Sequence, residues 1–156
     1  MKRINVNLAT RIATEHLSYR SLLEEIETDL ASVHPEDPAS IVRLTRLLRS
    51  FHSQVRGHFA LEEKGGLFEV YGEHAPAFRH QAGLMLQQHR VLLERLRRSL
   101  ETASSLEQLE GPEFEAFSRD LRDLIAALRK HERDEDELLE RLVEHDIRGI
   151  GALPRG

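Results

Sequence analysis

The feature that most constrains the fold is a set of three residues that occurs twice in the sequence, 73 positions apart. In each half, a histidine is followed 42 residues later by a second histidine, and four residues after that by a glutamate. The set comprises His16, His58 and Glu62 in the first half and His89, His131 and Glu135 in the second half. On a helix, residues four positions apart lie on the same face, so each second histidine and its glutamate can reach one site. Two helical hairpins that each carry this set can enclose a centre for two metal ions.

Apolar residues follow the same repeat. They recur at alternating spacings of four and three along four segments, which is typical of amphipathic helices with one buried face. A shift of 73 positions lays the apolar positions of the second segment onto those of the fourth, for example Leu48 onto Leu121. We therefore predict an all-α fold, an up-down-up-down four-helix bundle made of two related helical hairpins.

Proline, glycine and aspartate mark the expected helix boundaries. The first helix is expected over about residues 7–32. A proline is expected at the start of each later helix, where its missing N–H costs nothing: Pro38, Pro76 and Pro112. Asp37 is expected to cap the second helix with its side chain, and Gly65-Gly66 to end that helix.

Length and composition predict one domain with its own core. The chain has 156 residues, of which 40% are hydrophobic and 31% charged. The bundle domain is predicted to span residues 1–148, followed by a flexible C-terminal tail over residues 149–156. The absence of cysteine excludes disulfides, thiolate metal ligands and thiol nucleophiles.

Charge and hydropathy argue against nucleic-acid and membrane partners. Acidic and basic residues are interspersed around a net charge of −5, and no basic face is evident. The N-terminal segment lacks a signal-peptide core, and no apolar run approaches the length of a membrane span. We therefore expect a cytoplasmic protein that binds neither nucleic acid nor membranes.

The six polar residues of the repeat occupy positions that the apolar pattern assigns to the core. A lone buried histidine is more often a hydrogen-bonded core residue, and a single His-x-x-x-Glu pair on a surface is worth only ~0.3–0.5 kcal/mol. Four histidines and two glutamates in register on four helices indicate a metal site, because buried carboxylates need cations. Imidazole and carboxylate ligands suit iron, manganese or zinc, and a paired site in a helical bundle suits iron best.

This arrangement resembles the hemerythrin-like, or HHE, cation-binding domains over roughly residues 16–142. The likeness lies in the histidine of the first helix, the His-x-x-x-Glu of the second, the Gln-His of the third and the His-x-x-x-Glu of the fourth. The resemblance implies a non-haem di-iron centre in which the two histidines of each half bind one iron. Glu62 and Glu135 would bridge the two irons, alongside an oxo, hydroxo or water bridge.

One departure from the oxygen-carrying hemerythrins affects the expected function. Those proteins have a second histidine in the third helix, four residues from the first, whereas Met85 and Leu93 flank His89 at that spacing here. The four-His, two-Glu set is similar to variants associated with iron sensing or with nitric oxide and peroxide chemistry. The resemblance thus implies a protein that reacts with or senses oxygen, nitric oxide, peroxide or iron. Two alternatives stay open: a di-iron enzyme that reduces nitric oxide or peroxide or repairs iron clusters, and a zinc-bound or empty interaction module.

Four residues near the six predicted ligands are given separate interpretations. Tyr19 lies one turn after His16, and we expect either a core tyrosine or a hydroxyl beside the metals that acts as donor or ligand. Glu63 and Asp136 correspond under the repeat, and are expected beside the ligands or in solvent, with replacement of the neighbouring glutamate ligand as the alternative. Glu15 is expected to be exposed.

The remaining acidic and imidazole side chains are expected at the surface. Apart from Glu135, the acidic run at residues 132–137 is interpreted as a solvated helix face. Five histidines have no counterpart in the repeat and are expected in loops or on the surface: His34, His52, His74, His80 and His145.

Overall fold

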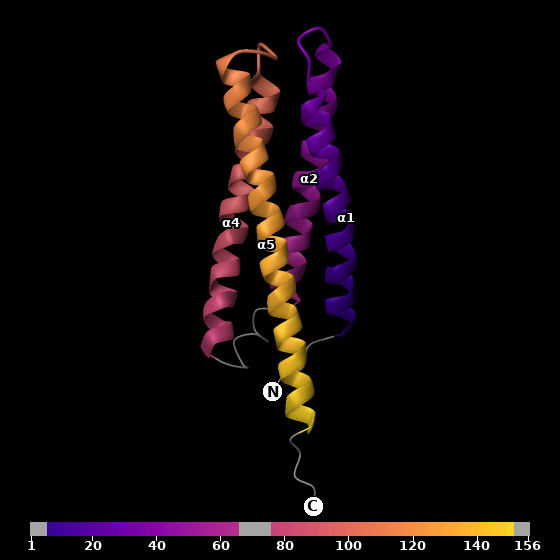
Figure 1. Ribbon diagram of the computed structural model, residues 1–156, viewed down its shortest axis with the longest axis vertical. Coiled ribbons are helices and arrows are strands. Elements are labelled where there is room, and N and C mark those ends of the chain that lie inside the picture. Colours follow the sequence, from indigo (N-terminus) through magenta and orange to yellow (C-terminus); the bar gives the residue numbers. More distant parts are fainter. Residues whose placement is uncertain (1–5, 66–75, 152–156) are drawn as a thin grey trace, which may run out of the picture.

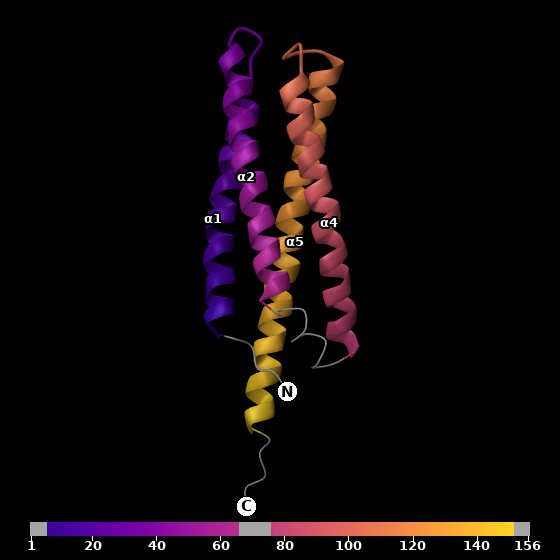
Figure 2. The same ribbon diagram turned by 180° about the vertical axis from the view of Figure 1, so that it is seen from behind.

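The computed structural model describes residues 6–65 and 76–151, and all regular secondary structure in these two ranges is helical. The helices are α1 (Val6–Ala31), α2 (Pro38–Lys64), α4 (Pro76–Ser105) and α5 (Pro112–Gly151). They run alternately up and down, and each packs against two neighbours in the cyclic order α1, α2, α4, α5 (Figures 1 and 2). The α1–α2 and α4–α5 connections lie at the same end (Figure 1). The predicted four-helix bundle is confirmed.

Most helix boundaries fall where the sequence places them. Each of the last three helices begins at a proline, whose fixed φ suits the first helical position and whose missing N–H would be unpaired there anyway. Helix α2 ends at Lys64, and Gly65 donates its N–H to the Leu61 carbonyl at 2.8 Å. Helix α5 continues to Gly151, so residues 149–151, which the sequence assigned to the tail, are helical. Residues 152–156 lie outside the described ranges.

The predicted side-chain cap at Asp37 is wrong. Its carboxylate accepts a hydrogen bond from Arg43 at 2.8 Å and makes no capping bond to the helix backbone. Ser40 organises this turn instead: its hydroxyl donates to the Asp37 carbonyl at 2.6 Å and accepts from the His34 N–H at 3.1 Å. The buried serine satisfies backbone groups on both sides of the turn and fixes the entry into α2.

Two apolar clusters fill the bundle, and along α1, α4 and α5 the repeated polar residues lie between them. The larger cluster draws on all four helices and includes Leu23, Leu48, Leu96 and Leu124. The smaller cluster consists of Ile12, Ala82, Met85, Leu138 and Leu142. Because burying one such large side chain stabilises the fold by about 1.5–3 kcal/mol, the clusters hold the helices in the register that brings the polar residues together. In the described part of the chain, no helix has the length and apolarity needed to cross a membrane.

Replacing two glycines by alanine should change the free energy of unfolding in opposite directions. Gly111 precedes α5 with φ of +88°, where a β-carbon costs about 1–2 kcal/mol. Gly83 lies exposed on α4, and apart from its chain neighbours and the adjacent backbone of α4, no described atom lies within 4 Å of the position its β-carbon would take. We expect Gly111→Ala to lower the free energy of unfolding in urea titrations, and Gly83→Ala to raise it by roughly 0.5–1 kcal/mol because alanine loses less backbone entropy. Changes of the same sign in both variants would contradict this assignment of backbone conformations.

Candidate metal centre

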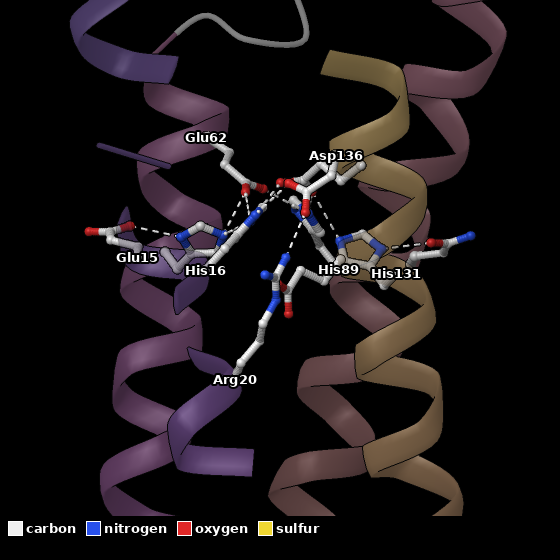
Figure 3. A network of polar contacts seen from close by, with 11 residues as sticks. Glu15, His16, Arg20, Glu62, His89, His131 and Asp136 are labelled. Carbon is white, nitrogen blue, oxygen red and sulfur yellow. Dashed lines mark hydrogen bonds and ion pairs between the residues drawn. The ribbon is translucent and has the colours of Figure 1, made fainter. Parts of the chain in front are cut away.

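The six repeated residues meet in one buried layer of the bundle (Figure 3). They come from all four helices: His16 from α1, His58 and Glu62 from α2, His89 from α4, and His131 and Glu135 from α5. None of the six residues is more than 6% exposed. Their ligand-type atoms form two overlapping groups that share Glu135, each compact enough to hold a metal ion.

The first group surrounds the inner nitrogens of His16 and His58. These two Nε2 atoms lie 3.0 Å apart. Glu62 Oε1 lies 2.6 Å from the Nε2 of His58, and Glu135 Oε1 lies 3.2 Å from that of His16. Two nitrogens that each lie about 2.1 Å from one metal ion at a right angle are about 3 Å apart. The spacing therefore fits a common ion.

The second group uses the other oxygens of the same two carboxylates. Glu62 Oε2 lies 3.1 Å from the Nε2 of His89, and Glu135 Oε2 lies 3.2 Å from that of His131. Each glutamate thus presents one oxygen to the histidine pair of the first half and its other oxygen to the pair of the second half. Carboxylates in this orientation can bridge two cations.

The donor atoms of this layer fit a bound cation. Both carboxylate oxygens of Glu62 and of Glu135, and the Nε2 of His131, are buried and make no hydrogen bond within the described residues. The short approach of His58 to Glu62 is an ion-pair contact whose geometry is not that of a hydrogen bond. Burying such groups without partners is costly, and metal coordination would satisfy all of them at once.

A family model described as the hemerythrin HHE cation-binding domain matches residues 7–143. The chain belongs to this family. Hemerythrin-like domains bind metal cations, and the buried His and Glu groups can hold them here. No curated protein and no solved structure matches the chain significantly.

Each histidine of this hemerythrin-like centre has a polar partner for its outer nitrogen on a neighbouring helix. Nδ1 of His16 lies 2.8 Å from an oxygen of Asp136, and Nδ1 of His58 lies 2.7 Å from an oxygen of Glu15. Nδ1 of His89 lies 3.2 Å from an oxygen of Glu63, and Nδ1 of His131 lies 2.7 Å from the amide oxygen of Gln88. An Nδ1–H that donates to these oxygens leaves the Nε2 lone pair directed at the centre. These contacts form a closed cycle around the bundle. A residue of α1 binds the histidine of α2, and a residue of α2 binds the histidine of α4. A residue of α4 binds the histidine of α5, and a residue of α5 binds the histidine of α1.

The sequence-based assignment of Glu15 as an exposed residue is wrong. Its side chain is 35% exposed and binds His58 through Oε2. The repeat itself carried the signal, because Glu15 directly precedes the first histidine of its half and Gln88 directly precedes the first histidine of the other half. Glu63 and Asp136 correspond in the same way, so the 73-residue repeat extends to the groups that bind the outer nitrogens of the four histidines.

The interpretation of residue 132 as part of a solvated face is also wrong. Glu132 is 4% exposed, and its Oε1 accepts from Arg20 Nε at 2.5 Å. Arg20 also donates through Nη2 to Asp136 Oδ2 at 2.9 Å (Figure 3). Residues 132 and 136 lie one turn apart on the side of α5 that faces α1, so they form a polar stripe beside His131 and Glu135.

The electrostatics of the layer favour positive charge. Burial lowers the pKa of His16, but Asp136, Glu135 and Glu62 outweigh it and raise that pKa to about 12. In the same way, burial lowers the pKa of His89, and the two glutamates raise it to about 9. Burial raises the pKa of Glu135, while the imidazoles of His131, His16 and His89 help to bring it well below the ordinary value. The layer therefore stabilises cations strongly.

Tyr19 lies beside the centre with its hydroxyl buried. Its ring centroid is 5.1 Å from that of Phe51 and 6.0 Å from that of His58. The hydroxyl has no hydrogen-bond partner among the described residues. Burial, with the charges of nearby glutamates, raises the pKa of Tyr19 well above its usual value, so the phenol stays protonated and can donate.

The position that distinguishes oxygen-carrying hemerythrins is apolar here. Met85 is buried in the smaller apolar cluster. Among the histidines outside the repeat, His34 and His80 are exposed and His52 is partly exposed, as predicted. His74 and the side chain of His145 lie outside the described residues.

The buried ion pair gives a stability prediction. Arg20→Ala leaves the Glu132 carboxylate buried without its donor, and we expect the free energy of unfolding to fall by about 1–3 kcal/mol in urea titrations. The double variant Arg20→Ala/Glu132→Gln should lose less, because no unpaired charge remains. Arg43→Ala is the control, since its pair with Asp37 is solvent-exposed and should contribute much less. An equal loss in the Arg20 and Arg43 variants would contradict the role of burial.

Proposed function

We propose that the protein is a non-haem di-iron protein whose four-His, two-Glu centre reacts with or senses oxygen, nitric oxide, peroxide or iron. The observation that supports this most directly is the orientation of Glu62 and Glu135. Each faces both histidine pairs, one oxygen to each. In this proposal His16 and His58 bind one iron, the other two histidines bind the second, and both glutamates bridge.

The donor count favours iron over zinc. Each ion would receive two imidazole nitrogens and two carboxylate oxygens from the chain, which is four protein donors. Four donors complete the coordination of a structural zinc ion, whereas iron with nitrogen and oxygen ligands accepts further ones. Iron in this centre would therefore keep exchangeable positions for a small ligand. Manganese and zinc are the competing metals.

Several side chains would shape the chemistry around the metals. When bound, a di-iron pair supplies redox chemistry with oxygen, nitric oxide or peroxide. Phe59 stacks on the His89 ring with a centroid distance of 3.8 Å and an interplanar angle of 5°, which fixes that imidazole. We propose that the Tyr19 hydroxyl donates a hydrogen bond to a ligand at the centre or occupies a vacant metal position. The apolar clusters on both sides exclude water.

Metal analysis tests the assignment. Protein purified from iron-rich cultures should contain about two irons per chain, as a paired site in a bundle requires. Glu62→Gln and Glu135→Gln should each reduce occupancy of both positions, because a bridging carboxylate serves both ions. Glu137→Gln, an exposed change on α5, is the control and should leave the iron content unchanged. One metal per chain, or stoichiometric zinc, would contradict the di-iron proposal.

Oxygen cycling tests whether the protein is a reversible carrier. Met85 replaces the additional histidine of the carriers, so both irons should retain exchangeable positions, and we expect air oxidation of the reduced protein to be irreversible. Optical spectra recorded through repeated oxygen removal and readmission measure this. Recovery of the starting spectrum in every cycle would identify a carrier. Turnover of peroxide or nitric oxide in excess over iron would instead identify an enzyme.

A further inference from the structure

The two halves of the centre differ in how their histidines are held from outside. Nδ1 of His58 donates to the Glu15 carboxylate, whereas Nδ1 of His131 donates to the neutral amide oxygen of Gln88, both at 2.7 Å. Residues 15 and 88 correspond under the repeat, so an amide in the second half occupies the place of a carboxylate in the first.

The outer contact of His89, in the second half, is also weaker than the corresponding contact of His16 in the first half. Glu63 lies 3.2 Å from Nδ1 of His89, while its counterpart Asp136 lies 2.8 Å from Nδ1 of His16. The Glu63 side chain is 43% exposed and that of Asp136 is 34% exposed. Solvent therefore competes more with the contact in the second half.

Two arginines lie beside the carboxylates of the first half, but they do not cancel the difference between the outer contacts of the two halves. Arg20 binds Asp136 through Oδ2, leaving Oδ1 on His16. Arg11 lies 3.7 Å from Oε1 of Glu15, which is the oxygen that does not face His58. Because a carboxylate shares its charge between both oxygens, these arginines reduce but do not remove the negative charge on the oxygens that touch the two imidazoles of the first half.

Outer hydrogen bonds change how strongly an imidazole binds a metal. An Nδ1–H that donates to a carboxylate makes a charge-assisted bond and increases electron density at Nε2, and an amide oxygen does so less. Removal of such a partner typically changes metal affinity by about 10- to 100-fold. With weaker partners at both histidines, the second half should be the poorer donor set.

We propose that the His16/His58 pair binds a divalent transition-metal ion more tightly than the His89/His131 pair, and that Gln88, as a positioning residue, sets this order. The inference rests on the proposed function, because it requires the six assigned ligands. This order of affinity means that the His89/His131 pair binds its metal ion last and releases it first.

Zinc(II) titration of the metal-depleted full-length protein tests the order without redox chemistry. With ¹⁵N-labelled histidine, ring nitrogen signals of His16 and His58 should shift at the first equivalent, before those of the other pair. Gln88→Glu should strengthen the weaker site by about 10- to 100-fold in competition with a coloured chelator, and Glu15→Gln should weaken the tighter site by a similar factor. The double variant Glu15→Gln/Gln88→Glu should reverse the order of filling.

Gln87→Glu is the matched control. It adds the same charge next to Gln88 at an exposed position, and we expect it to leave the order of filling unchanged. Simultaneous filling of both halves in the natural protein, or equal effects of Gln88→Glu and Gln87→Glu, would overturn the inference alone. Absence of stoichiometric metal binding in the natural protein would overturn the proposed function as well.

Discussion

Two glutamates buried in the interior dictate how the rest of this bundle is built. A carboxylate surrounded by apolar side chains is costly unless cations or donors surround it, and Glu62 and Glu135 are 0% and 1% exposed. The groups that compensate them are four imidazoles, and each comes from a different helix. The layer therefore exists only when all four helices hold the same register. The apolar clusters on both sides supply that register, so packing and the polar site depend on one another.

The sequence was sufficient to predict the fold and to find the six inward-facing residues, because both follow a simple period. A seam of apolar residues marks the buried stripe, and polar residues in that stripe stand out. Glu15 and Glu132 were misassigned for a physical reason. A helix in a bundle has two neighbours, and residues that flank the main seam are covered or exposed according to how those neighbours cross it. The spacing of apolar residues does not reveal this. Asp37 was misassigned because its carboxylate had a competing partner in Arg43.

The two long seams between the hairpins are stabilised by different interactions although the sequence repeat relates them. Between α1 and α5, Arg20 pairs with the buried Glu132. The positions that correspond to these residues are Leu93 and Phe59, and in the seam between α2 and α4 Phe59 stacks on His89. One seam is thus ionic and borders a groove lined by His16, Arg20 and Asp136, while the other is aromatic. The half-exposed arginine gives the α1–α5 side a polar boundary between the centre and solvent.

The cycle of outer hydrogen bonds has a consequence for the origin of the molecule. Each hairpin contains one contact within itself and offers one to the other hairpin, in the same direction around the bundle. Two identical copies of one hairpin, related by a twofold axis, would close the same cycle and assemble the same six inward groups. A half-length ancestor acting as a homodimer would thus have been sufficient for a complete centre. Fusion of two copies would then allow each half to change on its own, and two pairs of positions that correspond under the repeat differ here: Glu15 with Gln88, and Phe59 with Glu132.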